Sequence, residues 1–185
     1  MSDSPALRWL GAQADALDPL LRDLHARGGV LRGQVRFEYG AGVAGFLGRG
    51  LARRLGLRLK AGMHAFEVRI RHDGRSMHWD RCFEGGTWLR TVFTPVGTWP
   101  DGHWVERIGG LRILLTVEVS EGAWHWRLLD LNWHGLPLPR RLLRITAYKR
   151  AEQGRYRFHA GFALLGVGML FSYEGLLEAE MAAIE

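Results

Sequence analysis

The spacing of hydrophobic residues changes once along the chain, near residue 60. Before that point apolar residues recur mainly every three or four positions, and after it they alternate with polar ones. A period near 3.6 is typical of an amphipathic helix, and a period of 2 is typical of a strand with one buried face. The sequence therefore predicts N-terminal helices followed by a sheet.

Two helical regions are predicted in the first part. Between Pro5 and Arg27 the apolar spacing predicts one or two short helices, interrupted near Pro19 and ended by Gly28 and Gly29. Residues 43–57 predict another helix, although it contains two glycines. Its expected apolar stripe consists of Val43, Phe46, Leu47, Leu51 and Leu55.

The remainder reads as a series of strands. The alternating run after Lys60 turns at Asp73-Gly74 and predicts a hairpin. Because adjacent strands follow with short links, we expect a mainly β fold, an antiparallel meander curled into a barrel or half-barrel with one or two helices packed on it. We expect a single domain over 1–185, with a helical cap plus first strand over 1–60 and the sheet over 61–178. Further strands are predicted at 87–94, 103–108, 111–119, 123–131, 141–149, 154–164 and 167–174, with turn residues such as Gly109-Gly110 between them.

The stretch "EYGAGVAGFLGRG" contains a literal G-x-G-x-x-G at Gly40, Gly42 and Gly45. A dinucleotide-binding fold needs a continuously apolar strand before this motif and an acid about 20 residues later. Here the preceding run, 33–39, alternates, and position 60 is Lys60. We therefore expect no cofactor, and we expect the glycines to allow a sharp turn and close packing of a helix on the sheet.

Composition narrows the classes of partner. The 185 residues contain no apolar run of about 18 and begin with a polar segment, so we expect a cytoplasmic protein. The formal net charge of +6 comes mainly from arginine and favours anionic partners. Eight tryptophans interleaved with arginines suggest a base-stacking surface, but the absence of an RNP-like signature argues against nucleic acid.

Sequence motifs give no direct support for an enzyme. The eight histidines are scattered without a metal-binding spacing, so no metal site is predicted. No serine stands in a nucleophile motif. The segment 46–60, with its apolar stripe and its arginines, has two interpretations: it lies on an anionic membrane surface, or it covers one mouth of the sheet.

Charged residues on apolar strand faces are the most informative feature. Arg81 shares a face with Trp79 and Phe83, and Glu106 shares one with Trp104. Burying an unpaired charge is costly, so the two charged residues either meet inside the sheet or lie on exposed faces. Under the first alternative we predict an Arg81–Glu106 pair in the concave interior.

Six short motifs in order resemble the bacterial family known as domain of unknown function 4166. The resemblance spans nearly the whole chain and implies a domain that occurs alone or attached to other proteins, including oxidoreductase-like ones. It implies no established activity and no catalytic residue. The motifs are "DPLLRDLH", "WDRCF", "ERIGG", "LNWHGLPLPRRLL", "GRYRFHAGF" and "YEGLL".

The leading hypothesis is a non-catalytic domain that binds an apolar or amphipathic small molecule inside the curled sheet. An enzyme, or an accessory domain with an oxidoreductase-like protein partner, is the first alternative, and peripheral binding to an anionic membrane surface is the second. The predicted ligand-binding residues are Trp79, Arg81, Phe83, Trp104 and Glu106.

Overall fold

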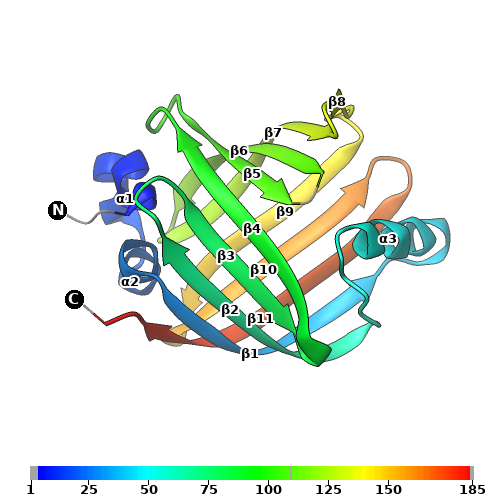
Figure 1. The fold of residues 1–185 in the computed structure, drawn as a ribbon, viewed down its shortest axis with the longest axis horizontal. Helices are drawn as coiled ribbons and strands as arrows, with labels where there is room; N and C mark the ends of the chain where they lie inside the picture. The colour runs from blue at the N-terminus through cyan, green and yellow to red at the C-terminus, as the bar shows by residue number, and fades with distance from the viewer. Residues whose placement is uncertain (1–3, 109, 184–185) are drawn as a thin grey trace.

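The protein forms a closed antiparallel β-barrel with helices at both ends (Figure 1). The computed structural model describes residues 4–108 and 110–183. The predicted mainly β meander with N-terminal helices is confirmed, and residue 109 of the predicted Gly109-Gly110 turn lies outside the described residues. The barrel strands are β1 (Gly29–Tyr39), β2 (Gly62–His72), β3 (Met77–Phe83), β4 (Thr87–Val96), β5 (His103–Ile108), β6 (Leu111–Ser120), β7 (Ala123–Trp133), β9 (Leu143–Glu152), β10 (Arg155–Leu164) and β11 (Gly168–Met181).

The strands follow one another around the barrel in chain order. Each pairs with the next, and β1 also pairs with β11 along its whole length, so the first and last strands lie side by side. Because β6 pairs with β7 and β7 with β9, the ring closes. Residues of alternate parity therefore point into one shared interior.

The seam between β7 and β9 is the weakest point of the ring. The two strands pair over only three positions, from Trp124 opposite Lys149 to Trp126 opposite Ala147. Beyond them the end of β7 pairs instead with the short strand β8 (Leu136–Pro137). The connection that contains Pro137 and Pro139 lies here, and its Leu138, Pro139 and Leu142 line the interior at this end.

The N-terminal helices cover one end of the barrel. They are α1 (Pro5–Leu10), the 3₁₀ helix η1 (Gly11–Ala16) and α2 (Pro19–Arg27). Asp18 caps α2 by accepting a hydrogen bond from the Leu20 amide at 2.8 Å, and Gly28 ends it with a positive φ. Helix α2 buries Leu21, Leu24 and His25, so this end of the barrel is plugged.

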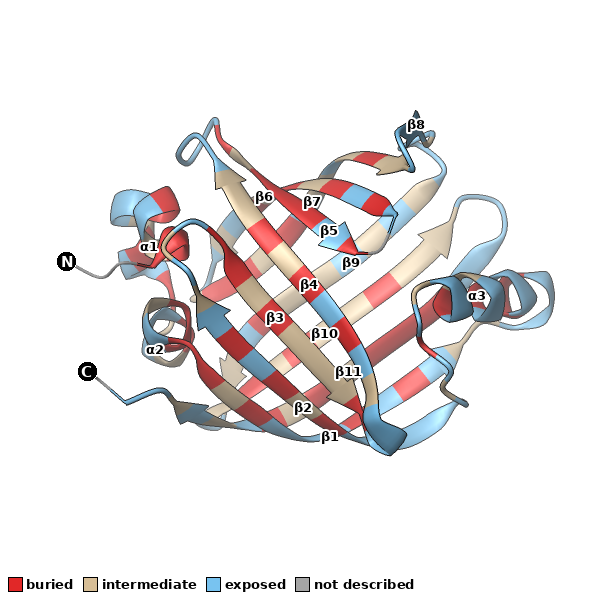
Figure 2. Cartoon of the chain, in the orientation of Figure 1, coloured by how far each residue is buried: buried red, intermediate tan, exposed pale blue. Residues whose placement is uncertain are grey.

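Helix α3 (Gly42–Arg54) packs at the other end, on β11 and β1 (Figure 1). Its buried residues are small: Ala44, Gly45, Gly48 and Ala52. Of the two interpretations of its large apolar stripe, the one in which the stripe covers the sheet does not hold for the first half of the helix, because Phe46 is 71% exposed. The exposed outer face of α3 is visible in Figure 2.

Close approach of the backbone explains this choice of buried face. A Cβ atom on Gly48 would collide with the carbonyl group of Leu170 on β11, and one on Gly40 would collide with that of Met169. The glycine motif therefore brings a helix onto the sheet, as predicted, and the alternating β1 that precedes it is one strand of a barrel. No described helix has the length and apolar character needed to cross a bilayer.

Candidate functional site

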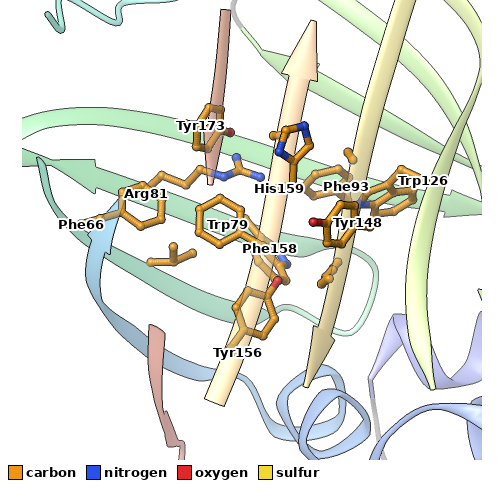
Figure 3. A pocket seen from close by; sticks show the side chains of 14 residues that line it. Phe66, Trp79, Arg81, Phe93, Trp126, Tyr148, Tyr156, Phe158, His159 and Tyr173 are labelled. Carbon is orange, nitrogen blue, oxygen red and sulfur yellow. The ribbon is translucent and has the colours of Figure 1, made fainter. Parts of the chain in front are cut away.

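The barrel interior holds several polar side chains among aromatic rings (Figure 3). Arg81 comes from β3, Glu106 from β5 and Lys149 from β9, each on the inward parity of its strand. Tyr156 and Tyr173, from β10 and β11, are buried beside them. We call these five residues, together with His25 of α2, the interior polar cluster.

Lys149 sits in a cage of three tryptophans. Its amine lies 4.1 Å from the ring centre of Trp79, 4.5 Å from that of Trp124 and 5.4 Å from that of Trp126. Aromatic faces attract an ammonium ion. Burial opposes the charged form more strongly, and nearby Arg81 adds to that effect, so the pKa of Lys149 lies well below its usual range.

The partner of Lys149 is His25, whose Nε2 lies 2.7 Å from the amine. The other ring nitrogen, Nδ1, lies 2.7 Å from the carbonyl oxygen of Leu21, so Nδ1 carries the ring proton and donates it in a hydrogen bond to Leu21, while Nε2 accepts a hydrogen bond from the Lys149 amine. The His25 ring stacks on Trp124. Burial, with Lys149 as a further cause, holds the pKa of His25 well below its usual value.

Arg81 directs its guanidinium toward the inside of the barrel. Of its five N–H donors, one is used within the described residues, in a hydrogen bond from Nη1 to Oγ1 of Thr91 at 2.7 Å. Arg81 lines two small cavities of about 60 and 70 Å³, the first shared with Trp79 and Lys149 and the second with Glu106. It thus presents unused donors to space that a ligand group can occupy.

Glu106 is only 9% exposed and lines the second cavity. Burial raises the pKa of its carboxyl group to about 7, and the charges of Arg81 and Lys149 only partly offset this effect. Among the described residues its carboxyl group has no hydrogen-bond partner, and the direct pair with Arg81, predicted for the case in which both face the interior, is not formed. Both side chains face the interior, but Arg81 bonds to Thr91 instead.

A larger apolar cavity of about 250 Å³ lies at the α3 end. It shares Leu55, Ile113, Ile145 and Phe162 with the cavity that contains Arg81 and Glu106. The interior therefore runs from an apolar chamber at one end to polar groups near the middle. The chamber is further lined by Leu47, Leu51, Leu111, Leu131, Trp133, Leu138, Pro139, Leu142, Leu143, Leu164 and Leu170.

The family model described as "Domain of unknown function (DUF4166)" matches residues 17–177. The chain belongs to this family. The matched region includes α2, the strands from β1 to β10, β11 up to Leu177 and every member of the interior polar cluster, and it confirms the resemblance inferred from the six motifs. Comparison with curated proteins gives no match. The DUF4166 assignment therefore identifies the domain but no activity.

The predicted ligand-binding residues take different places in this DUF4166 barrel. Trp79 and Arg81 line the first cavity and Glu106 lines the second. Phe83 is buried against Phe37, Phe66 and Tyr173, and Trp104 against Trp9, Trp124 and Trp126. Phe83 and Trp104 face inward as predicted, but their rings pack in the core and line none of the three interior cavities.

Sequence reasoning missed Lys149, His25 and the two tyrosines. A signal existed for Lys149, because it follows Ile145 and Ala147 on the same strand parity. His25 carried none, since its place depends on how α2 seats on the barrel. Among the described residues, no group of three or more histidine, cysteine or acidic side chains is arranged to hold a metal ion.

Proposed function

We propose that the barrel binds an amphipathic small molecule, with its apolar chain in the 250 Å³ chamber and an anionic head near Arg81. The main support is that the apolar chamber and the cavity beside Arg81 share lining residues, so the two spaces lie next to each other. The Arg81 guanidinium makes one hydrogen bond within the described residues and has further donors to offer a ligand. Small-molecule sites typically combine mostly apolar walls with a few placed polar groups.

The size of the chamber supports a ligand longer than one ring. A dry apolar cavity of about 150 Å³ accommodates benzene, and drug-sized ligands occupy roughly 300–1,000 Å³. The chamber, at about 250 Å³, falls between these two sizes, and the cavities of about 60 and 70 Å³ are further, smaller spaces in the same interior. A single alkyl chain or a small fused ring system fits this space better than a branched, multi-chain molecule.

The charges support an anionic head. Arginine keeps its positive charge at physiological pH and is suited to bidentate carboxylate recognition. Glu106 titrates near neutral pH, so it only partly neutralises that charge. A ligand carboxylate beside Arg81 would receive the donors that the described residues leave unused.

Native mass spectrometry of the purified protein tests the proposal first, with a co-purified small molecule as the expected result. The second test is titration with 11-(dansylamino)undecanoic acid, a fluorescent fatty acid, and with its methyl ester.

A pair of variants on β9 tests whether the probe enters the chamber. Ile145→Phe narrows the chamber and should weaken binding of the fatty acid at least tenfold, whereas Thr146→Phe, on the exposed face of the same strand, should not. An empty protein that binds neither probe would overturn the proposal.

Arg81→Met tests the head-group contact. We expect about a 10- to 100-fold loss of affinity for the carboxylate, since a hydrogen-bonded charge contributes roughly 1.5–3 kcal/mol. Affinity for the methyl ester should change much less. The matched control is Arg90→Met, at an exposed position on neighbouring β4. Equal losses for acid and ester would remove Arg81 from the head-group site.

A second candidate, catalysis on the bound molecule, is favoured by the gathering of titratable groups in one interior. Glu106, with a pKa near 7, suits general acid–base chemistry. The test is chemical recovery: a ligand incubated with the protein is extracted and compared by mass spectrometry with one incubated with Glu106→Gln. A product that depends on Glu106 would favour an enzyme, and unchanged ligand would favour binding alone.

A further inference from the structure

The α3 end of the barrel exposes an unusual number of large apolar side chains. They come from three separate segments: the first half of α3, the β7–β9 connection and the β10–β11 turn. Phe46 and Leu136 are each 71% exposed, and Leu165 is 55% exposed. We call the whole set the apolar rim: Val43, Phe46, Leu47, Leu136, Leu142, Leu165, Val167 and Met169.

The three segments of the rim are joined at one end of the molecule. The Leu165 amide donates to the Leu142 carbonyl at 2.8 Å, which ties the β10–β11 turn to the β7–β9 connection. The Gly40 amide donates to the Leu170 carbonyl at 3.1 Å, which ties the start of α3 to β11. Figure 1 shows α3, β8 and the β10–β11 turn toward the same side of the barrel.

Basic residues surround the rim. Residues 40–60, 134–146 and 161–170 contain no aspartate or glutamate. Among the described residues, the turns at this end carry one acid, Glu84 between β3 and β4, and Glu38 lies on β1 two residues before Gly40, whereas the turns at the opposite end carry acids such as Asp73, Asp101 and Glu121. The arginines and the lysine within residues 40–60 and 134–146 are all exposed: Arg49, Arg53, Arg54, Arg58, Lys60, Arg140, Arg141 and Arg144.

The rim also borders the apolar chamber. Leu47 and Leu142 belong to both, because each is exposed and each lines the cavity. Because β7 and β9 pair over only three positions, side chains of α3 and of the β7–β9 connection form part of the chamber wall at this end. An apolar surface laid against the rim would thus contact the chamber.

We propose that the rim and its arginines form a docking face for an anionic lipid bilayer. Apolar side chains would enter the boundary between headgroups and acyl chains, and the arginines would attract anionic headgroups. A bilayer fits better than a folded protein partner, because the apolar residues stand on three projecting segments, two of which carry basic residues and none of which carries an acidic one. If the barrel holds an amphiphile, as proposed above, this face is also its entrance.

Flotation with vesicles tests the docking face. The full chain is mixed with vesicles of phosphatidylcholine alone or with 30% phosphatidylglycerol, at low and high salt. We expect binding to the anionic vesicles that weakens with salt. Phe46→Ser should reduce it about tenfold, while Val96→Ser, an exposed apolar position near the opposite end, should not. Failure to bind anionic vesicles at low salt would overturn the proposal.

The charge contribution has its own pair of variants. Arg53→Gln/Arg141→Gln should weaken binding by at least tenfold, because each arginine near an anionic surface contributes about fivefold. Arg75→Gln/Arg90→Gln changes net charge equally at exposed positions outside the three segments and should have little effect. Equal losses in both pairs, or a dimer in light scattering that Phe46→Ser dissolves, would overturn the bilayer as the occupant. Arg81→Met should bind vesicles normally even where it loses the fatty acid, so the two proposals fail independently.

Discussion

The amine of Lys149 lies 2.7 Å from Nε2 of His25, although 124 positions separate the two residues. This contact joins strand β9 to the helix that plugs the barrel. It also gives the buried amine a hydrogen-bond acceptor inside a cage of indole rings, and it orients the amine beside the first cavity.

His25→Phe should therefore destabilise the protein by about 1–3 kcal/mol, because the ring still stacks on Trp124 but the amine loses its acceptor. Lys149→Met should cost less, since it removes a group whose burial is unfavourable. The double variant should be more stable than His25→Phe alone. Urea unfolding of the three variants measures this coupling, with exposed Lys60→Met as control, and simple additivity would contradict it.

Thr91 is the residue that holds the Arg81 guanidinium. Its side chain is fully buried and accepts the hydrogen bond from Nη1. Thr91→Val keeps the shape but deletes the acceptor, so we expect a loss of about 1–3 kcal/mol in the free energy of unfolding. Thr116→Val, a partly exposed position on β6, should be nearly neutral. Similar losses in both would indicate a general β-strand effect.

Arg81 and its hydrogen-bond partner show how much of the site could be predicted from the sequence. Period-2 alternation put Arg81 on the same face of β3 as Trp79, and Glu106 on an apolar face of β5, because strand geometry fixes parity regardless of the neighbours. It could not predict the partner of Arg81. The choice between Thr91 and Glu106 depends on the stagger of β3, β4 and β5, which the pattern of one strand does not contain.

Helix α3 shows the opposite case. Hydrophobic periodicity assumes that the face with the largest apolar side chains is buried. Here the small residues allow the helix backbone to lie against β11, and that close approach decides the orientation. Phe46 is consequently exposed, and the choice that hydrophobic periodicity left open, between a stripe on the sheet and a stripe on a membrane, is decided by this packing of small residues.

Two glycines of α3 provide a matched test of this packing. Gly48→Ala should destabilise the protein by about 1–3 kcal/mol, because the new methyl group meets the Leu170 carbonyl. Gly50→Ala, in the same helix with open space around it, should stabilise it by about 0.5–1 kcal/mol through helix propensity. Thermal unfolding measures both. Stabilisation by Gly48→Ala would show that α3 does not pack this closely.

Glu106 should make stability depend on pH. Its folded pKa, about 7, is raised above the usual value near 4.5. Between these values the folded state binds more protons than the unfolded state, so its contribution to stability is fully present below pH 4.5 and is lost as the pH rises through 7. Burial raises the pKa of Glu106, and the charged groups that face it, Arg81 and Lys149, lower it.

Glu106→Gln removes this dependence. The free energy of unfolding of the variant, relative to that of the wild type, should therefore rise by about 3 kcal/mol between pH 4 and pH 8. The difference between the two proteins is the useful quantity, because His25 acts in the opposite direction: its lowered pKa makes stability fall as the pH drops below 6.5. Urea unfolding across this range measures the difference. Glu118→Gln, at an exposed position on β6, is the control. A flat difference curve for Glu106→Gln would mean that the Glu106 carboxyl group titrates at its ordinary pKa, as it would if it were hydrated or directly paired with Arg81.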